Sequence, residues 1–303
     1  MAQYGATLSP DDRPLSAEQL SDALRSADIL LCTLGDRLTR EVLDVSHRRT
    51  RMLANFGVGV DHIDRSAARD LGLIVTNTPG ALTEDTADLA MMLILAAARR
   101  TSEGESEVRR GAWTGWRPTH MLGQSVHGAT LGIIGFGRIG AAVARRAHFG
   151  FGMRVRYFAR PGVPGRNPSV DYATPEPNLA SLLSDSDFVS LHCPSTPDTR
   201  HLIDAAALTT MKPTAFLINT ARGDVVDASA LAAALRVGTI AGAGLDVYEG
   251  EPTIHPALLT APNVTLLPHI GSATVGSRTA MGMMCIDNID AFVRGEELLN
   301  QLV

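Results

Sequence analysis

Short apolar runs alternate with longer amphipathic or alanine-rich segments along the chain. In the first third, runs typical of buried strands lie at 28–33, 51–56 and 73–77, and residues 2–8 predict a weaker opening strand. Helices are predicted over 16–26, 39–45 and 83–98, and the last of these is expected to cross into a second domain. Because strands that alternate with helices usually pair in parallel, the pattern predicts a doubly wound α/β fold.

The same alternation continues through the rest of the chain. Further strands are predicted at 129–134, 153–158, 188–193, 216–219, 240–247 and 263–267. Further helices are predicted at 141–149, 179–183 and 275–292. Two parallel-sheet domains therefore account for most of the sequence, whereas residues 101–127 show no clear period.

A glycine-rich turn joins the strand at 129–134 to the helix that follows it. The turn is Gly135-Phe136-Gly137-Arg138-Ile139-Gly140. In this context Gly135 permits a tight turn, Gly137 lets backbone amides approach a pyrophosphate, and Gly140 lets helix and strand pack closely. The pyrophosphate would bind at the helix N-terminus, where unpaired N–H groups favour an anion. We therefore predict a dinucleotide site; the alternative is a purely structural turn.

The residues after the next strand indicate which dinucleotide binds. Sites for NAD place an acidic residue about 20 residues past the glycines, where it binds the ribose 2′-hydroxyl. No Asp or Glu occurs between 141 and 170, and the strand at 153–158 is followed by Ala159 and Arg160, with Arg166 close behind. Because an arginine can bind a 2′-phosphate, NADP(H) is the expected cofactor and NAD(H) remains possible. In the alternative, Arg160 is only a solvated loop charge.

Polar side chains follow three successive predicted strands in the C-terminal half: Arg222 after 216–219, Asp246 and Glu251 at and beyond the end of 240–247, and His269 after 263–267. Ligands of an open parallel sheet bind outside the carboxyl ends of its strands. In reduction of a 2-keto acid, His269 can protonate the carbonyl oxygen, Glu251 can stabilise the charged imidazole, and Arg222 can bind the carboxylate. Asp246 is either a cofactor contact or a rival for the carboxylate role.

Two glycines flank Val58 in Gly57-Val58-Gly59, directly after the strand at 51–56. Such a segment leaves backbone N–H groups available to bind a carboxylate. The Val58 and Gly59 amides are therefore expected to complete the substrate anion site; the alternative is a plain tight turn.

Composition excludes several classes of function. The chain has 303 residues, of which 45% are hydrophobic and 19% charged, with a net charge of −5 and no block of basic residues, so neither nucleic acid nor a membrane surface is an expected partner. The three cysteines have no metal-ligand spacing, no metal is expected, and a reducing compartment is indicated. No signal peptide is evident, and the apolar run at 89–98 is too short to cross a bilayer, so a cytoplasmic location is expected.

Taken together, these motifs resemble the D-isomer-specific 2-hydroxyacid dehydrogenases. The resemblance rests on the motifs Asn55 to Asp61, Leu131 to Gly140, Asn219 to Gly223, Gly244 to Tyr248 with Glu251-Pro252, and Leu267 to Thr274. It implies that Arg222, Glu251 and His269 are the catalytic residues. It also implies cofactor contacts at Thr86, Arg138, Ile139, Cys193, Pro194, Thr199, Thr220, Ala221, Asp246 and Gly271, in addition to the glycine motif, Ala159, Arg160, Arg222 and His269.

Within the family, the chain is most similar to the glyoxylate and hydroxypyruvate reductases. The reasons are Arg160 in place of an acidic residue and the segment 111–118, which is similar to their dimerisation arm. In such relatives the arm around 101–127 wraps the partner subunit and Trp116 can help to close the partner's substrate pocket, so a homodimer is expected. The implied division is a flavodoxin-like substrate (lid) domain, 1–81 and 272–303, and a Rossmann domain, 82–271.

One departure from the family and two alternative functions remain open. Family members usually begin with a strand and helix of about 20 to 25 residues before the position of Ala2, so the substrate domain is expected to lack its first strand. The residues around Leu34, Gly35, Trp116 and Met121 do not determine substrate size. The alternatives are an NAD-linked dehydrogenase for a larger 2-hydroxy acid and a dinucleotide-sensing protein similar to corepressors of this fold.

Overall fold

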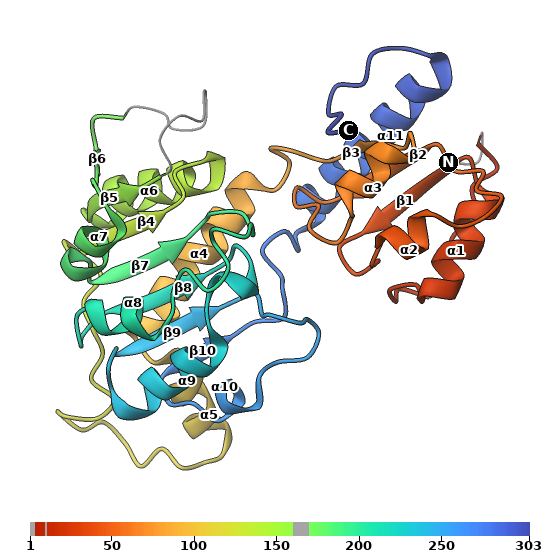
Figure 1. Cartoon of the computed structure of the whole chain (residues 1–303). Helices are drawn as coiled ribbons and strands as arrows, with labels where there is room; N and C mark the ends of the chain where they lie inside the picture. Colours follow the sequence, from red (N-terminus) through yellow and green to blue (C-terminus); the bar gives the residue numbers. More distant parts are fainter. Residues whose placement is uncertain (1–3, 10, 160–169) are drawn as a thin grey trace. The chain divides into compact units, whose positions relative to one another are not determined.

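The computed structural model describes residues 4–9, 11–159 and 170–303. The chain divides into two compact units, a smaller one of Met1–Ala81 with Val275–Val303 and a larger one of Leu82–Thr274 (Figure 1). Residues 272–274, which the sequence assigns to the substrate domain, belong to the larger unit.

The smaller unit is built on a three-stranded parallel sheet in the order β1 (Ile29–Thr33), β2 (Met52–Phe56), β3 (Ile74–Thr76). Helices α1 (Ala17–Ser26), α2 (Arg40–Leu43) and α3 (Arg65–Asp70) pack on one face through a leucine-rich core. The C-terminal helix α11 (Val275–Arg294) covers the other face, where Ile289 packs against Met52 and Ala54. Ser16 is the N-cap of α1 and forms a capping box with Gln19.

The prediction of an opening strand at 2–8 is wrong over its described part. Residues 4–9 form no strand and are exposed, with Leu8 78% exposed. Because these residues bury almost no apolar surface, nothing offsets the entropy cost of ordering them as a strand. Within the described residues β1 pairs with β2 alone, whereas the outer edge of β3 is covered by the C-terminal segment, in which Leu302 N donates to Val75 O at 2.8 Å.

The larger unit contains a seven-stranded parallel sheet in the order β10-β9-β8-β7-β4-β5-β6. The strands are β4 (Thr130–Ile134), β5 (Arg154–Phe158), β6 (Ala173–Pro175), β7 (Phe188–Leu191), β8 (Phe216–Asn219), β9 (Gly242–Leu245) and β10 (Val264–Leu266). The order reverses between β4 and β7, which is the topological switch point where a doubly wound sheet binds its ligand. The Rossmann fold predicted for this region is thereby confirmed.

Helices cover both faces of this sheet. On one face α4 (Thr83–Ala98) and α6 (Arg138–Phe151) pack over residues such as Leu131, Ile133 and Ile218. On the other face α7 (Leu179–Asp185), α8 (Ala205–Thr210), α9 (Ala228–Val237) and α10 (Pro256–Leu259) pack over Val189, Leu217 and Leu245. Burial on both faces explains why these strands are continuous apolar runs rather than alternating ones.

Several elements of the larger unit were not predicted: α5 (Thr101–Arg109), β6, α8, α9 and α10. Helix α5 has no buried residue, so the sequence shows no apolar period there. By contrast, α9 carries recognisable signals, because Asp227 caps its N-terminus and Gly238 ends it in a left-handed conformation (φ 73°).

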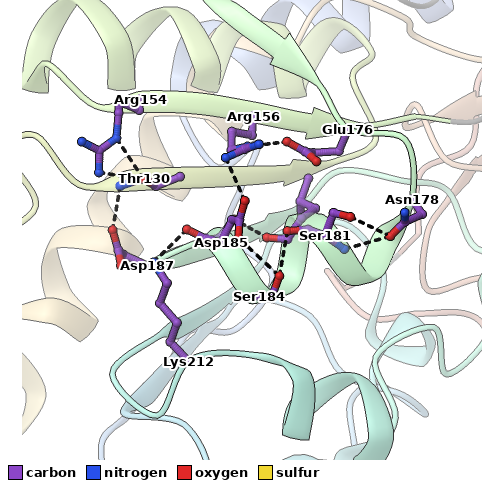
Figure 2. A network of polar contacts seen from close by, with 12 residues as sticks. Thr130, Arg154, Arg156, Glu176, Asn178, Ser181, Ser184, Asp185, Asp187 and Lys212 are labelled. Atoms are coloured by element: carbon purple, nitrogen blue, oxygen red, sulfur yellow. Dashed lines mark hydrogen bonds and ion pairs between the residues drawn. The ribbon is translucent and has the colours of Figure 1, made fainter.

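A polar network joins the amino ends of β4, β7 and β8, at the edge of the sheet away from the switch point (Figure 2). Thr130 N donates to the Asp187 carboxylate at 2.8 Å, and Lys212 Nζ donates to the same carboxylate at 2.8 Å. Burial alone would raise the Asp187 pKa, but the Lys212 ammonium and the Thr130 amide lower it below its usual range. This network fixes the start of three strands and is structural.

Candidate active site

The glycine turn after β4 has the close approaches that the motif requires. Gly135 has a φ of 93°, and a Cβ atom there would lie 2.6 Å from the backbone nitrogen of Cys193, two residues past the end of β7. A Cβ on Gly140 would lie 2.3 Å from the Gly135 carbonyl oxygen. By contrast, nothing lies within 4 Å of a Cβ on Gly137, which is the N-cap of α6. The turn therefore leaves open space in front of helix amides that no side chain caps, which fits a pyrophosphate.

The residues expected to contact a dinucleotide lie along the carboxyl edge of the sheet in the larger unit. Cys193 and Pro194 follow β7, Thr220 and Ala221 follow β8, and Ala159 follows β5. Thr86, in the first turn of α4, donates to the Gly271 carbonyl at 3.0 Å, and Thr199 donates to the Pro194 carbonyl at 2.7 Å. Arg160 and Arg166 lie outside the described residues.

One orphaned hydroxyl supports the fit to a cofactor. The Thr220 Oγ1 atom is buried and has no hydrogen-bond partner in the structure. A buried, unsatisfied hydroxyl is costly in a folded protein unless a ligand completes it. Together with the open space at Gly137, it indicates that the residues at this edge fit a nicotinamide dinucleotide.

His269 and Glu251 form a pair at the same edge. The His269 Nδ1 atom lies 2.7 Å from Glu251 Oε2, while Glu251 Oε1 accepts a hydrogen bond from Tyr248 N at 2.8 Å. Burial would raise the Glu251 pKa, but the hydrogen bond and charge of His269 lower it below its usual range, helped by Arg222. Glu251 is therefore ionised and holds His269 through Nδ1, leaving Nε2 without a hydrogen bond to any described residue.

Asp246 bonds to the backbone that directly follows His269 rather than to the imidazole ring. His269 has a φ of 55°, in the left-handed region that a non-glycine residue rarely adopts. The two carboxylate oxygens of Asp246 accept hydrogen bonds from the Ile270 and Gly271 amides, both at 2.8 Å. Burial raises the pKa of Asp246, and these two amides oppose that shift. Of the two candidate carboxylates, Glu251 is the one that bonds to the imidazole.

The turn that carries Arg222 is shaped by Asn219, the last residue of β8. The Asn219 side chain accepts from Ala221 N at 3.0 Å and donates to the Arg222 carbonyl at 2.8 Å. The next residue, Gly223, packs against the loop that carries Glu251: a Cβ there would lie 1.8 Å from the Tyr248 carbonyl carbon. The two loops are therefore in backbone contact, which only glycine permits.

The sequence did not predict a further set of contacts made by Glu249, in the loop that carries Glu251. Glu249 binds both His201 Nε2 at 2.9 Å and Arg200 Nη1 at 2.6 Å. Although Glu249 lies far from the adjacent Arg200 and His201 in the sequence, the acidic pair Glu249 and Glu251 in one loop was a usable signal. These two contacts of Glu249 hold the loop after β9 against the segment after β7.

The remaining predicted site residues lie elsewhere. Val58 and Gly59 lie in the smaller unit, in the loop after β2, where both are partly exposed. Trp116 lies in the larger unit and is 84% exposed. The part of the chain that the structure describes brings together no group of His, Cys, Asp and Glu side chains suited to a metal ion. None of its helices has the length and apolar character needed to span a membrane.

Comparisons with known proteins agree with this geometry. Residues 91–271 match the family model of the D-isomer specific 2-hydroxyacid dehydrogenase NAD binding domain. The chain is 47% identical over 292 residues to a glyoxylate reductase from Thermococcus onnurineus, covering 94% of this chain and 86% of that protein.

Solved structures are similar over nearly the same span. A protein from Thermus thermophilus has a TM-score of 0.87 and 44% identity, covering 95% of this chain and 90% of that one. An NADPH-dependent glyoxylate/hydroxypyruvate reductase from Sinorhizobium meliloti, solved with NADP and malonate, has a TM-score of 0.85 and 37% identity, covering 95% and 88%. The chain therefore belongs to the D-isomer-specific 2-hydroxyacid dehydrogenase family, as an NAD(P)-dependent enzyme.

Proposed function

We propose that the protein is a cytoplasmic reductase that converts glyoxylate and hydroxypyruvate to 2-hydroxy acids of the D series with NADPH. The observation that carries the proposal is the His269–Glu251 pair at 2.7 Å, which lies on the same sheet edge as Arg222 and the glycine turn. The glyoxylate reductases among the relatives support the choice of substrate. In this proposal the smaller unit is the substrate domain and the larger unit the dinucleotide-binding domain.

Each side chain has a defined role in the proposed reaction. When bound, the reduced nicotinamide supplies the hydride. His269 donates a proton from Nε2 to the substrate carbonyl oxygen, and Glu251 stabilises the charged imidazole through Nδ1. Arg222 binds carbonyl and carboxylate oxygens of the substrate, because a guanidinium presents paired donors. In the smaller unit, the Val58 and Gly59 amides bind a carboxylate group.

A panel of acceptors tests the substrate class. Oxidation of NADPH and, separately, of NADH should be followed with glyoxylate, hydroxypyruvate, pyruvate and phenylpyruvate. The proposal predicts the highest kcat/KM for the two small acceptors. Preference for phenylpyruvate would favour a dehydrogenase of larger acids, and cofactor binding without turnover of any acceptor would favour a sensor.

The preference for NADPH rests on the charges near the end of β5. In the described part of this edge, the Glu176 carboxylate is already bonded to Arg156, which also contacts Asp185 at 2.9 Å (Figure 2). An acidic residue engaged in this way is a poor partner for a ribose hydroxyl. Arg160 follows the same strand in the sequence and is proposed to bind the 2′-phosphate.

The variant Arg160→Asp tests the cofactor preference. It should shift the ratio of kcat/KM for NADPH to that for NADH towards NADH by at least about tenfold, because it removes a phosphate partner and adds repulsion. Arg236→Asp makes the same charge change at the end of α9 and should leave the ratio unaltered. An unchanged ratio in Arg160→Asp would remove Arg160 from the cofactor site.

We also propose a homodimer, in which residues 101–127 contact a second copy and Trp116 contributes to its substrate pocket. Four large apolar side chains in this segment are exposed: Val108 at 62%, Trp113 at 56%, Trp116 at 84% and Leu122 at 67%. Large exposed apolar side chains concentrated in one segment support an interface there. Light scattering of the eluted protein should give twice the 32.1 kDa chain mass; a monomer would contradict the proposal.

A further inference from the structure

The loop after β2 in the smaller unit is held by two buried asparagines. The Asn55 side-chain nitrogen donates to the carbonyl oxygens of Gly57 and Gly59, both at 2.9 Å. The Asn77 side-chain nitrogen donates to the Val58 carbonyl oxygen, also at 2.9 Å. Asn55 is fully buried and Asn77 is 9% exposed. Three consecutive carbonyls are thus bonded by side-chain amides, an arrangement that chain geometry alone does not require.

The remaining contacts fix the orientation of the Asn55 amide. Thr78 N also donates to the Gly57 carbonyl, at 3.0 Å, so both lone pairs of that oxygen are used. Because every partner of Asn55 Nδ2 is a carbonyl oxygen, the nitrogen must face the loop. On the opposite side of the amide, Cys32 Sγ lies 4.0 Å from Asn55 Oδ1 as a weak donor. The side chain therefore has one satisfied orientation.

Two N–H groups of the same loop, those of Val58 and Gly59, remain available as donors. Among the described residues, none accepts a hydrogen bond from the Val58 or Gly59 amide. Both residues are partly exposed, and we infer that the two donors are left for a ligand. Because the asparagines hold the carbonyl oxygens of this loop in place, its amides can bind an anion without any rearrangement of the loop. Such preorganisation is the main source of strength in anion sites built from backbone amides.

We propose that Asn55 and Asn77 are positioning residues for substrate binding, which hold the Gly57, Val58 and Gly59 carbonyls so that the Val58 and Gly59 amides bind the substrate carboxylate. This inference rests on the proposed function, to which it adds two residues that do not touch the substrate. Loss of either amide frees a carbonyl oxygen to turn, and a carboxylate in its place repels that oxygen. The effect is on binding of the carboxylate, not on the cofactor.

The test uses Asn77→Ala and Asn77→Asp, together with Asn55→Ser. KM for glyoxylate and the inhibition constant of oxalate, a two-carbon carboxylate probe, should rise together by about tenfold in Asn77→Ala and further in Asn77→Asp. The change in kcat should be smaller, and the Kd of NADPH should stay within about twofold of wild type. Asn77 is the primary site because Asn55 makes two of the three bonds, so that its replacement carries the greater risk of unfolding.

Asn288→Asp is the matched control. Asn288 is a buried asparagine of the same unit, 2% exposed, whose side-chain nitrogen donates to Met284 O within α11 at 2.7 Å and not to the loop. It should lower the melting temperature as much as Asn77→Asp does while leaving the oxalate inhibition constant near that of wild type.

The outcomes separate this inference from the function on which it rests. If wild type does not reduce glyoxylate but binds oxalate, and Asn77→Ala weakens that binding, the asparagine inference stands and the reductase proposal falls. If wild type reduces glyoxylate and the folded Asn77 variants keep its KM and oxalate inhibition constant, the inference is overturned and the reductase proposal stands.

Discussion

The two units present their polar groups in different ways. In the larger unit the candidate site consists of side chains at successive strand ends, with His269 bonded to Glu251 and Asp246 bonded to the following backbone. In the smaller unit the candidate anion site consists of backbone amides. The side chains of Asn55 and Asn77 bond to the carbonyl groups of the same loop. The first kind of site is visible in the residue types of a sequence. The second is visible mainly in the hydrogen bonds of a structure.

Because the larger unit builds its site from side chains on separate loops, its activity should be most sensitive to substitution where the Arg222 and Glu251 loops are in contact. Gly223→Ala should lower kcat/KM for glyoxylate by about a hundredfold, because a Cβ 1.8 Å from the Tyr248 carbonyl carbon must displace the loop that carries Glu251. Steady-state kinetics measures the loss. Gly150→Ala, where nothing lies within 4 Å of the added atom, is the control and should behave as wild type. Normal activity in Gly223→Ala would show that the loop contact is dispensable.

A second prediction separates cofactor binding from stability within the larger unit. Thr220→Val should weaken NADPH binding by about tenfold, since it removes a hydroxyl left for the cofactor. The same change should stabilise the cofactor-free protein by about 1 kcal/mol, because it removes an unsatisfied buried group. Calorimetric titration and chemical denaturation measure the two quantities. If NADPH affinity and the stability of the cofactor-free protein both decreased, Thr220 would be a structural residue.

The smallest expected effect concerns acid stability. Because the folded-state pKa of Glu251 is lowered from 4.5, its ionised form stabilises the fold fully above the unfolded pKa, and this contribution is lost as the pH falls through the folded pKa. Glu251→Gln lacks the contribution at every pH. The difference in unfolding free energy between wild type and variant should therefore shrink as the pH is lowered from about 6 to about 3. A difference that grew in acid would contradict the lowered pKa.

The same contrast explains what sequence could predict. Apolar runs predict every strand of both sheets except β6, of which only Ala173 is buried. The placement of Arg222, Glu251 and His269 at one edge could be predicted because parallel strands end there. Helix α5 was not predicted because it buries no residue and so has no apolar face. The bond of Asn77 to the Val58 carbonyl and the contact of Glu249 with His201 join segments that are distant in the sequence, and no local period encodes them. The bonds of Asn55 stay within its own loop, but they depend on a loop conformation that residue types do not specify.

In the proposed reaction His269 donates the proton when a 2-keto acid is reduced. The most direct measurement compares wild type with His269→Ala in NADPH oxidation with glyoxylate, while the Kd of NADPH is measured for both. If His269 is the proton donor, kcat should fall by about 10² to 10⁴-fold in the variant, with the Kd of NADPH nearly unchanged. A variant with intact cofactor binding and a kcat within a few-fold of wild type would contradict that role.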